Sequence, residues 1–339
     1  MHHQARMFAL LLALSLAAPA CAGVAKRVDG PRDRRAGAAS LHDVRSWAYQ
    51  IQGLEEDGAV EALVNSAYDM LVIEPTRSVR GSAGFDTAGL VARLHQRGKL
   101  VLAYIDIGEA EDYRLYWEED WQAPGQRMAG EPDFLVTLDP DGWSGNYPVA
   151  FWDERWKAIV IYDDESLLNM ALADGFDGVY MDWIEAFSDP SVAAAAAAQG
   201  RDTALEMVRF VGEIRTYSRE KWPAFLVVAQ NGADLVELAS QYTEAIDGLA
   251  QENLFYAGAA DTEWGDPRSG DISTSTADRE YLLDLLEVYR EAGVRLFCVD
   301  YALRPEHAAD AYRQHQEAGC AGYVSQSPLS RLTDTPPPR

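Results

Sequence analysis

The chain has 339 residues, of which 54 are Asp or Glu and 29 are Lys or Arg, so its formal net charge at pH 7 is −25. This charge argues against a nucleic-acid partner, because binding to phosphates depends on Lys and Arg. It favours a neutral or cationic ligand, since acidic clefts concentrate positive ligands, although a solvated acidic surface is the simpler explanation of the bulk charge. The sequence has no CxxC, HExxH, GxGxxG or P-loop motif, so we expect no metal site and no bound cofactor.

The N-terminus has the pattern of a secretory signal peptide, which we assign to residues 1–20. Arg6 precedes an apolar run from Met7 to Ala18 that is too short to cross a bilayer comfortably, and Ala18-Pro19-Ala20 is a small-residue cleavage pattern. We therefore expect an exported protein that is extracellular, periplasmic or membrane-anchored. Cys21 leaves two alternatives open: it is either the lipid-bearing residue of a bacterial lipoprotein or the first residue after ordinary cleavage.

Both ends of the mature chain have the composition of unstructured segments. Residues 21–42 are rich in Arg and Lys and poor in apolar residues, which predicts a flexible tether, and residues 331–339 contain a Pro-Pro-Pro run, which predicts a disordered tail. One folded domain is expected over residues 43–330. Its length of about 290 residues suits a large α/β barrel, which typically takes roughly 250.

Short apolar runs alternate with helical patterns along this domain. The runs have the length of buried parallel strands, and they lie at Trp47 to Tyr49 and at residues 70–74, 100–106, 175–182, 225–230, 248–252 and 294–300. Helical periodicity is found at residues 87–97, 202–218 and 277–292. Alternating strands and helices predict a parallel sheet with right-handed crossovers, and a count of about eight strands favours closure. The predicted fold class is α/β, a single (β/α)8 TIM barrel.

Carboxylates and aromatic residues stand where these strands end. Asp182, Trp183 and Glu185 directly follow the strand within GFDGVYMDWIEAF, and polar residues end the other runs in the same way. In a barrel these positions converge on one face, where ligands bind. A lone Asp at such a position is as often a helix cap, but repetition at several strands favours a site. Packing explains most of the aromatic residues; Trp183, between two acids, is favoured as a ligand contact.

Two cysteines fall inside the predicted domain. Cys298 lies late in one predicted strand and Cys320 at the start of the next. A disulfide is one alternative, but parallel neighbouring strands would place the two residues at opposite ends of the barrel. We therefore favour two buried free thiols.

Six segments in a fixed order resemble one family of enzymes. They read WAYQIQG from Trp47, YDMLVIEPTRS from Tyr68, GKLVLAYIDIGEAEDYRLYW from Gly98, GFDGVYMDWIEAF from Gly175, AQNG from Ala229 and AQENLFY from Ala250. This combination resembles the endo-α-1,4-polygalactosaminidase family of glycoside hydrolases (glycoside hydrolase family 114) and its bacterial relatives. The resemblance implies a secreted or surface-attached (β/α)8 barrel that acts on galactosamine-containing exopolysaccharide.

The resemblance also implies a catalytic pair. In the family an Asp ends the fourth strand and a Glu ends the sixth, and these positions correspond to Asp182 as nucleophile and Glu252 as general acid/base. Two carboxyl groups on separate strands are what cleavage of a glycosidic bond requires. One departure is that this chain has MDWIE where known hydrolases tend to have PDNVD, which leaves the exact sugar open. The residues expected to line the substrate subsites are Tyr49, Glu74, Tyr104, Asp106, Glu109, Trp183, Glu185, Asn231, Asp300 and Tyr301.

The predicted function is therefore glycoside hydrolysis, with endo-acting cleavage of an α-1,4-linked, galactosamine-containing polysaccharide by a monomer as the first hypothesis. A carbohydrate-binding surface protein of the same fold, without turnover, is the alternative. A sugar deacetylase is disfavoured, because it usually needs a metal-binding set of His and Asp that the sequence does not offer. The sequence leaves endo or exo action and the retaining or inverting outcome open.

Overall fold

The computed structural model describes residues 40–82, 84–125 and 128–333. The predicted signal peptide, Cys21 and almost all of the predicted tether lie outside the described residues. Within the described ranges, no helix has both the length and the apolar composition needed to cross a membrane.

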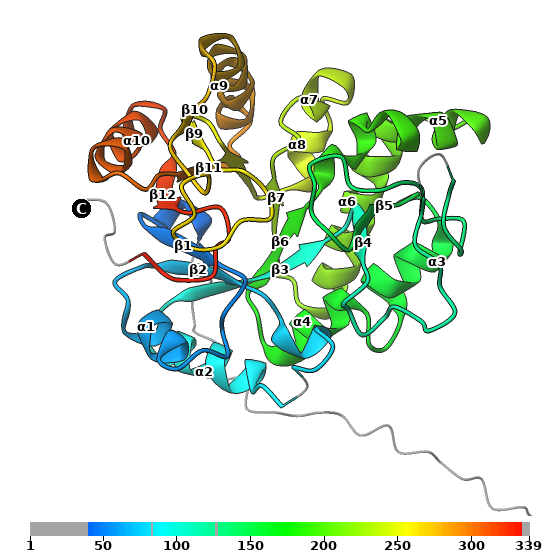
Figure 1. The fold of residues 1–339 in the computed structure, drawn as a ribbon, viewed down its shortest axis with the longest axis horizontal. Coiled ribbons are helices and arrows are strands. Elements are labelled where there is room, and N and C mark those ends of the chain that lie inside the picture. The colour runs from blue at the N-terminus through cyan, green and yellow to red at the C-terminus, as the bar shows by residue number, and fades with distance from the viewer. Residues whose placement is uncertain (1–39, 83, 126–127, 334–339) are drawn as a thin grey trace, which may run out of the picture. The chain divides into compact units, whose positions relative to one another are not determined.

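The described residues form an eight-stranded parallel sheet with the order β1-β2-β3-β6-β7-β8-β11-β12. Helices surround the sheet, and the strands radiate around a common centre (Figure 1). The indole Nε1 of Trp47 in the first strand donates a hydrogen bond of 2.8 Å to the carbonyl of Ala321 in the last, so the two edges of the sheet meet. The predicted (β/α)8 barrel is confirmed. Its strands are β1 (Trp47–Gln50), β2 (Met70–Ile73), β3 (Leu100–Asp106), β6 (Gly178–Asp182), β7 (Leu226–Gln230), β8 (Gly248–Glu252), β11 (Arg295–Tyr301) and β12 (Ala321–Ser325).

Two short hairpin pairs and the helices complete the described fold. β4 (Glu109–Glu111) pairs with β5 (Asn146–Pro148), and β9 (Tyr256–Ala257) pairs with β10 (Ile272–Ser273), both antiparallel. The helices are α1 (Ala59–Asn65), α2 (Thr87–Gln96), α3 (Glu154–Lys157), α4 (Leu167–Asp174), α5 (Pro190–Ala198), α6 (Thr203–Lys221), α7 (Leu235–Leu238), α8 (Tyr242–Ala245), α9 (Thr276–Glu291) and α10 (Pro305–Glu317), with short turns η1 (Leu41–Asp43), η2 (Thr76–Ser78), η3 (Ala158–Tyr162) and η4 (Ile184–Ser188).

The three predicted helices are present, and each begins at a side-chain cap. Asp86, Asp202 and Ser275 accept backbone N–H groups in the first turns of α2, α6 and α9, which satisfies donors that a helix start leaves unpaired. A run of six alanines at residues 193–198 belongs to α5, where Asp189 is the cap and Pro190 the first helical residue. Alanine has the highest helix propensity, so this segment continues the helix.

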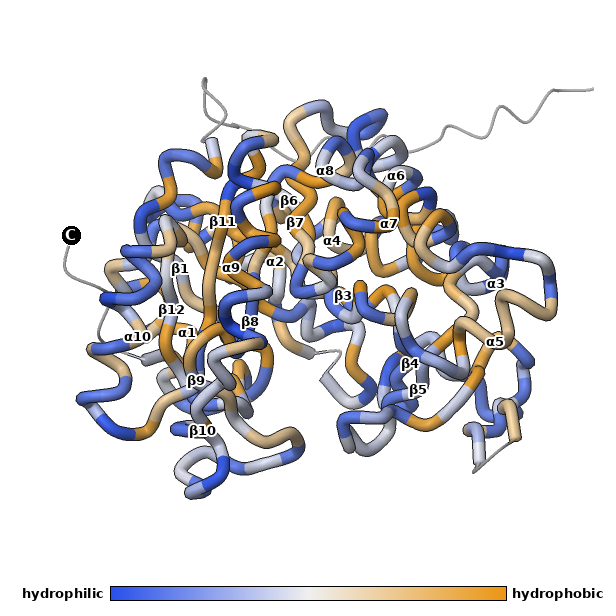
Figure 2. Tube along the Cα trace, turned by 90° about the horizontal axis from the view of Figure 1, so that it is seen from above, coloured by the Kyte–Doolittle hydropathy of each residue, from blue (hydrophilic) through white to orange (hydrophobic). Residues whose placement is uncertain are grey.

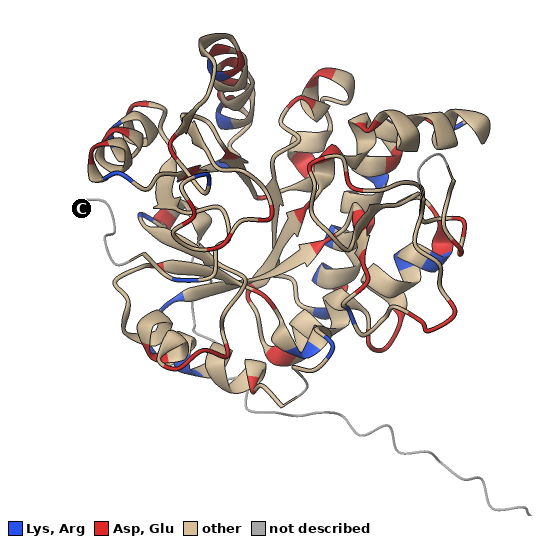
Figure 3. Ribbon diagram, in the orientation of Figure 1, with Lys and Arg blue, Asp and Glu red and all other residues tan. Residues whose placement is uncertain are grey.

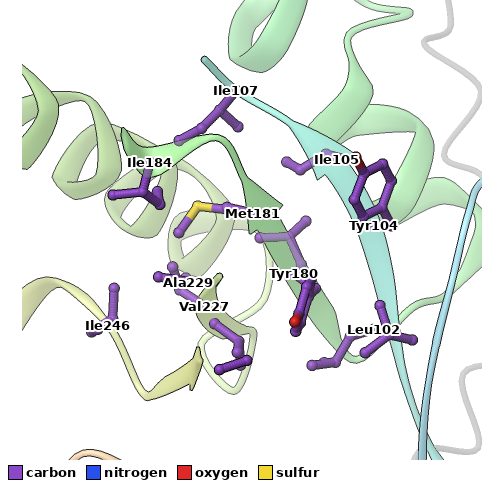
Figure 4. Packing of buried hydrophobic residues seen from close by; sticks show 14 of the residues in the cluster. Leu102, Tyr104, Ile105, Ile107, Tyr180, Met181, Ile184, Val227, Ala229 and Ile246 are labelled. Atoms are coloured by element: carbon purple, nitrogen blue, oxygen red, sulfur yellow. The ribbon is translucent and has the colours of Figure 1, made fainter. Parts of the chain in front are cut away.

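Buried apolar residues of the strands and of the surrounding helices form one continuous core, and hydrophobic positions of the trace lie mainly towards the inside of the molecule (Figure 2). The side chains of Tyr180 and Met181 leave opposite sides of β6 (Figure 4), as the two-residue period of a strand requires. Inside the barrel, the Trp47 ring lies 6.0, 5.5 and 6.0 Å from the rings of Tyr180, Phe297 and Tyr323. The interior is therefore a packed core, and a ligand can enter only at its end.

The prediction of two free thiols is wrong, because Cys298 and Cys320 form a disulfide. The register of β11 and β12 pairs Phe297 with Ala321 and Cys298 with Gly322. The last strand is therefore staggered along its neighbour, so the residue before β12 lies beside the middle of β11 and the Cα atoms are 5.7 Å apart. Staggered strands are a requirement of barrel closure.

The predicted tail starts too early. Leu332 packs against the core, and the Thr333 carbonyl accepts a hydrogen bond of 2.8 Å from the Tyr68 hydroxyl. Just before it, the carbonyl of Leu329 accepts the backbone N–H of Ile51 after β1, at 3.1 Å. The segment from Ser327 to Thr333, which we call the closing segment, thus fastens the last strand to the first. At the other end, Leu41 is buried in the core, inside the range assigned to the tether.

Candidate active site

A cavity of about 730 Å³ opens at the C-terminal ends of the barrel strands. Eleven of the residues that line it are carboxylic acids, and no Lys, Arg or His is among the described residues of its lining. Acidic segments lie in the loops around the centre of the barrel (Figure 3). The cavity lining is therefore strongly acidic. Its acids are Glu55, Glu74, Asp106, Glu109, Glu111, Asp141, Asp182, Glu185, Asp189, Glu252 and Asp261.

Asp182 is the last residue of β6 and lies at the cavity surface. The Tyr104 hydroxyl donates a hydrogen bond of 2.7 Å to its Oδ2, and the backbone N–H of Trp183 donates one of 2.8 Å to its Oδ1. Burial, and then the negative charge of Glu252, raise the pKa of Asp182 to about 7. Each carboxylate oxygen is thus held in place, while the group stays able to gain or lose a proton near neutral pH.

Glu252 ends β8 and is held by a separate set of donors. Asn231 Nδ2 donates 3.0 Å to its Oε2, and the Tyr301 hydroxyl donates to its Oε1. Asn231 also accepts the backbone N–H of Glu252 at 2.9 Å, which fixes the end of the strand. Burial raises the pKa of Glu252, and the hydrogen bonds from Tyr301 and Asn231 oppose that rise.

Asp182 and Glu252 line the same cavity from strands that have only β7 between them. Two strand spacings place their backbones roughly 10 Å apart, and the curvature of the barrel turns both side chains towards its axis. The electrostatic effect of Glu252 on the pKa of Asp182 shows that the two charges interact. Two interacting carboxyl groups lose their protons as a pair, so one proton is retained by the pair over a range of pH.

Three neighbouring strands end in the same unusual backbone conformation. Trp183, Asn231 and Asn253, each directly after a barrel strand, have φ values of 57°, 56° and 55°. Asn adopts this left-handed region more readily than most residues, but it is strained for a bulky residue such as Trp. Strained residues of this kind cluster at functional sites. The conformation turns the chain sharply at the cavity floor, so each strand end presents its last side chain to the cavity.

The turn after Asp182 depends on close packing against Gly108, where a Cβ atom would lie 2.1 Å from the Trp183 carbonyl oxygen. We expect Gly108→Ala to displace Trp183 and Asp182 and to lower the free energy of unfolding by about 1–3 kcal/mol. The displacement of Asp182 should also lower the hydrolytic rate. Urea denaturation and initial rates test this. Gly212→Ala in α6 is the matched control, because no atom lies within 4 Å of its added Cβ and Ala favours a helix by about 0.5–1 kcal/mol. Equal stability of the two variants would contradict the role of this contact.

A second set of acids lines the cavity beside Asp182 and Glu252, and an arginine neutralises part of its charge. Arg114 is buried and binds Glu74 and Glu111, with N···O distances of 2.6 Å to each. Burial raises the pKa of Glu74, and Arg114 opposes that rise. None of the ion pairs among the described residues involves Glu185, and burial together with the charge of Asp182 raises its pKa well above the usual range.

Nine of the ten residues expected to line subsites do line the cavity: Tyr49, Glu74, Tyr104, Asp106, Glu109, Trp183, Glu185, Asn231 and Tyr301. Asp300 does not, and this prediction is wrong. It is fully buried, accepts the backbone N–H groups of Phe255 and Tyr256 at 2.7 Å each, and pairs with His315 of α10. Successive strand residues alternate in direction, so Tyr301 faces the cavity while Asp300 faces the helix layer.

Several lining residues were missed by the sequence argument. Gln230 ends β7, and its side-chain oxygen accepts a hydrogen bond of 3.1 Å from the Tyr49 hydroxyl. Its position at the end of a strand could have predicted that it lines the cavity. The loop before β5 supplies a further wall, made by Pro140, Asp141, Trp143 and Ser144. This loop has no strand or helix period, so nothing in its sequence connected it to the barrel mouth. Within the described ranges, no group of three or more His, Cys, Asp or Glu is arranged to hold a metal ion.

A family model described as glycoside-hydrolase family GH114 matches residues 30–335. The chain belongs to this family. The resemblance found in the sequence is thereby confirmed, and the GH114 chain is a glycoside hydrolase by family. An uncharacterized protein of Deinococcus radiodurans is 30% identical over 294 residues, which cover 86% of this chain and 84% of that protein. An uncharacterized protein of Thermotoga maritima is also 30% identical, over 84% of this chain and 81% of its own.

Two solved structures share the fold of this GH114 chain. The glycoside hydrolase domain of PelA from Pseudomonas aeruginosa has a TM-score of 0.59 at 15% identity, covering 86% of this chain and 98% of that domain. Aspergillus fumigatus Ega3, solved in complex with galactosamine, has a TM-score of 0.59 at 13% identity, covering 90% of this chain and 100% of Ega3. At these identities the likeness shows a common barrel architecture.

Proposed function

We propose that this GH114 chain hydrolyses a galactosamine-containing polysaccharide through Asp182 and Glu252. The observation that carries the proposal is that both carboxyl groups lie in one acidic cavity, each fixed by its own hydrogen-bond donors. A cavity of about 730 Å³ accommodates a short stretch of sugar residues. Amino sugars carry ammonium groups, which suit a lining of many acids and no base. Ega3, which has the same fold, was solved with galactosamine bound.

The two carboxyl groups would divide the chemistry between them. Asp182 attacks the anomeric carbon while Glu252 gives its proton to the leaving glycosidic oxygen, so the bond to the leaving sugar breaks and a glycosyl ester of Asp182 forms. Glu252, now charged, takes a proton from water, and the resulting hydroxide attacks the same carbon. This step releases the sugar, restores the Asp182 carboxylate and returns the proton to Glu252. Tyr104 and Asn231 hold the two carboxylates during both steps.

The direct experiment is incubation of the purified protein with defined polymers of galactosamine, N-acetylgalactosamine and galactose, followed by mass spectrometry of the products. Oligosaccharides released from the galactosamine polymer, with none from the Asp182→Asn variant, are the expected result. Binding of the polymer without any release would instead identify a carbohydrate-binding protein.

The pH dependence of the reaction follows from the raised pKa of Asp182. Hydrolysis needs one charged and one protonated carboxyl group in the pair. As pH rises through about 7, the value for Asp182, the pair loses its last proton and no acid remains for the leaving group. We therefore expect kcat/KM to fall about tenfold per pH unit above pH 7. A rate that stays constant up to pH 9 would contradict this.

We also propose that the protein is exported. The buried disulfide between Cys298 and Cys320 supports this, because disulfides persist in oxidising compartments outside the cytosol. The signal pattern and Cys21 predict either release or lipid attachment. Metabolic labelling with palmitate, compared between wild type and Cys21→Ala, separates the two outcomes.

A further inference from the structure

Asp300 and His315 form a buried pair behind the strand end that carries Glu252. Asp300 is 0% exposed and His315 is 1% exposed. Asp300 Oδ1 accepts the backbone N–H groups of Phe255 and Tyr256 at 2.7 Å each. Its Oδ2 is hydrogen-bonded to His315 Nε2. A buried ion pair is weak evidence for stability, because the cost of removing charges from water offsets their attraction. The proposed hydrolysis does not use this pair, so its place in the core indicates another role.

Three consecutive residues of β11 hold the end of β8. Val299 lies opposite Glu252 in the register of the two strands, and its carbonyl accepts the backbone N–H of Asn253 at 3.0 Å. Asp300 then holds the turn that follows, through the two N–H groups named above. The Tyr301 hydroxyl donates to the Glu252 carboxylate itself. One short segment of β11 thus fixes both the backbone and the carboxylate of the same strand end.

The packing of His315 decides which proton it carries. Its Nδ1 has no hydrogen-bond partner among the described residues. Gly322 of β12 packs so closely against this atom that a Cβ there would lie 2.2 Å from it. A proton on Nδ1 would be a buried donor without an acceptor, which is costly. The packing therefore favours the tautomer that carries its proton on Nε2 and donates it to Asp300. In this tautomer the imidazole is neutral, and the pair keeps the negative charge of Asp300.

The charge of Asp300 reaches Glu252. Burial raises the pKa of Glu252, the hydrogen bonds from its neighbours oppose the rise, and the charge of Asp300 adds to it. Asp300 also faces His315 and the Tyr256 hydroxyl. Asp300 lies outside the cavity lining, so neither solvent nor substrate screens its charge. Glu252 interacts electrostatically with further titratable groups, which are Asp182, Glu185, Tyr49, Tyr180 and Tyr301.

We propose that Asp300 and His315 are positioning residues that act through Glu252. They fix its strand end, and the buried charge of Asp300 helps Glu252 to keep the proton that it gives to the leaving group. This inference rests on the proposed function, because it assigns the pair a part in the same acid/base step. Neither residue lines the cavity. Substitutions should therefore change kcat and its pH dependence, while KM stays nearly the same.

The main test compares the pH profiles of Asp300→Asn and Asp177→Asn. Asn keeps an oxygen that accepts the two backbone N–H groups but removes the charge. Asp177 is the matched control, because it accepts the backbone N–H of Val101 at 2.8 Å and pairs with His95 at 2.8 Å, before the start of β6. We expect kcat/KM of Asp300→Asn to begin its fall at a pH lower by at least about 0.5 unit. Asp177→Asn should follow the wild-type profile. An unshifted profile in Asp300→Asn, or equal shifts in the two variants, would overturn the proposal.

Two substitutions of His315 test the hydrogen bond to Asp300 apart from the charge. His315→Leu leaves Oδ2 of Asp300 without its donor, whereas His315→Gln supplies an amide donor. We expect His315→Leu to lower kcat about 10–100-fold by displacing the strand end, and His315→Gln to restore part of that loss. Rates are measured well below the melting temperature of each variant. Equal kcat values in the two variants would refute the role of this hydrogen bond.

A measurement without substrate separates this inference from the proposed function. Carbon-13 NMR of labelled glutamate side chains follows the titration of Glu252, whose resonance is the one missing in Glu252→Gln. Its midpoint should be lower in Asp300→Asn than in wild type. If the midpoint moves but wild type cleaves no polymer, the hydrolase is refuted and the electrostatic role of Asp300 stands. If wild type cleaves the polymer and the midpoint does not move, that role is refuted and the hydrolase stands.

Discussion

Asp182→Asn and Glu252→Gln are each expected to reduce the rate of polysaccharide cleavage by at least about 1,000-fold, because one removes the proposed nucleophile and the other the proposed acid/base. Both substitutions keep the shape of the side chain and its place at a strand end. Tyr104 and Trp183 still contact position 182, and Asn231 and Tyr301 still contact position 252. Reducing-end assays with a galactosamine polymer measure the loss directly. Retention of more than a tenth of the activity by either variant would refute its assigned role.

The stability of Asp182→Asn gives a second readout that does not depend on substrate. A carboxyl whose folded pKa is raised to about 7 stabilises the fold less as pH increases, and the loss is complete above that pKa. Asn carries no charge at any pH. The variant should therefore match wild type near pH 4 and be more stable at pH 8, by at most about 4 kcal/mol for a shift of roughly three pKa units. Thermal unfolding at both pH values tests this; a lower melting temperature than wild type at pH 8 is the contradicting result.

Arg114→Met is expected to cause the largest loss of stability among single substitutions near the cavity. The Arg114 side chain is 3% exposed, and the Glu111 side chain that it binds is 2% exposed. Removing the cation leaves Glu74 and Glu111 buried without a counter-charge, which typically costs about 3–5 kcal/mol. The loss should be larger at pH 8 than at pH 5, because burial raises the pKa of Glu74 and its protonation at the lower pH relieves part of the loss. Urea denaturation at both pH values measures the effect.

Arg313→Met provides the matched control for that experiment. Arg313 also binds two carboxylates, Asp310 and Glu317, but its side chain is 56% exposed on α10. Water screens exposed ion pairs, which contribute about 0–1 kcal/mol. Losses of similar size in the two variants would show that the buried cluster does not stabilise the fold in the way described.

The sequence predicted those features that depend on local pattern and chain order. Each barrel strand is a short apolar run, and a polar residue marks the point where it leaves the core. This pattern predicts that Asp182 and Glu252 lie at the same end of the barrel, and the structure has both in one cavity. The sequence also predicts that Trp183 directly follows the strand, but it does not predict the left-handed backbone conformation of this residue.

The errors share a physical origin, because each depended on three-dimensional geometry that no local sequence pattern records. Asp300 and Tyr301 differ by one position, and only the direction in which the strand faces decides which one reaches the cavity. The pairing of Cys298 with Cys320 depended on the stagger between β11 and β12. The cavity wall from Pro140 to Ser144 belongs to a loop. Its sequence has no helical or strand periodicity from which its path could be predicted. Hydrogen bonds of the closing segment likewise join residues about 280 positions apart.

The closing segment has a consequence for how this barrel can change its substrate. Ser327 and Leu329 line the cavity. The Leu329 carbonyl also accepts a hydrogen bond from the backbone N–H of Ile51, across the junction of the first and last strands. Altering that side of the cavity therefore risks opening the barrel itself. The wall from Pro140 to Ser144 lies outside every described strand and helix, and it is not part of the junction between the first and last strands. Insertions and replacements should be tolerated there, as in surface loops generally, so new specificities within this lineage would arise on one flank while the other stays fixed.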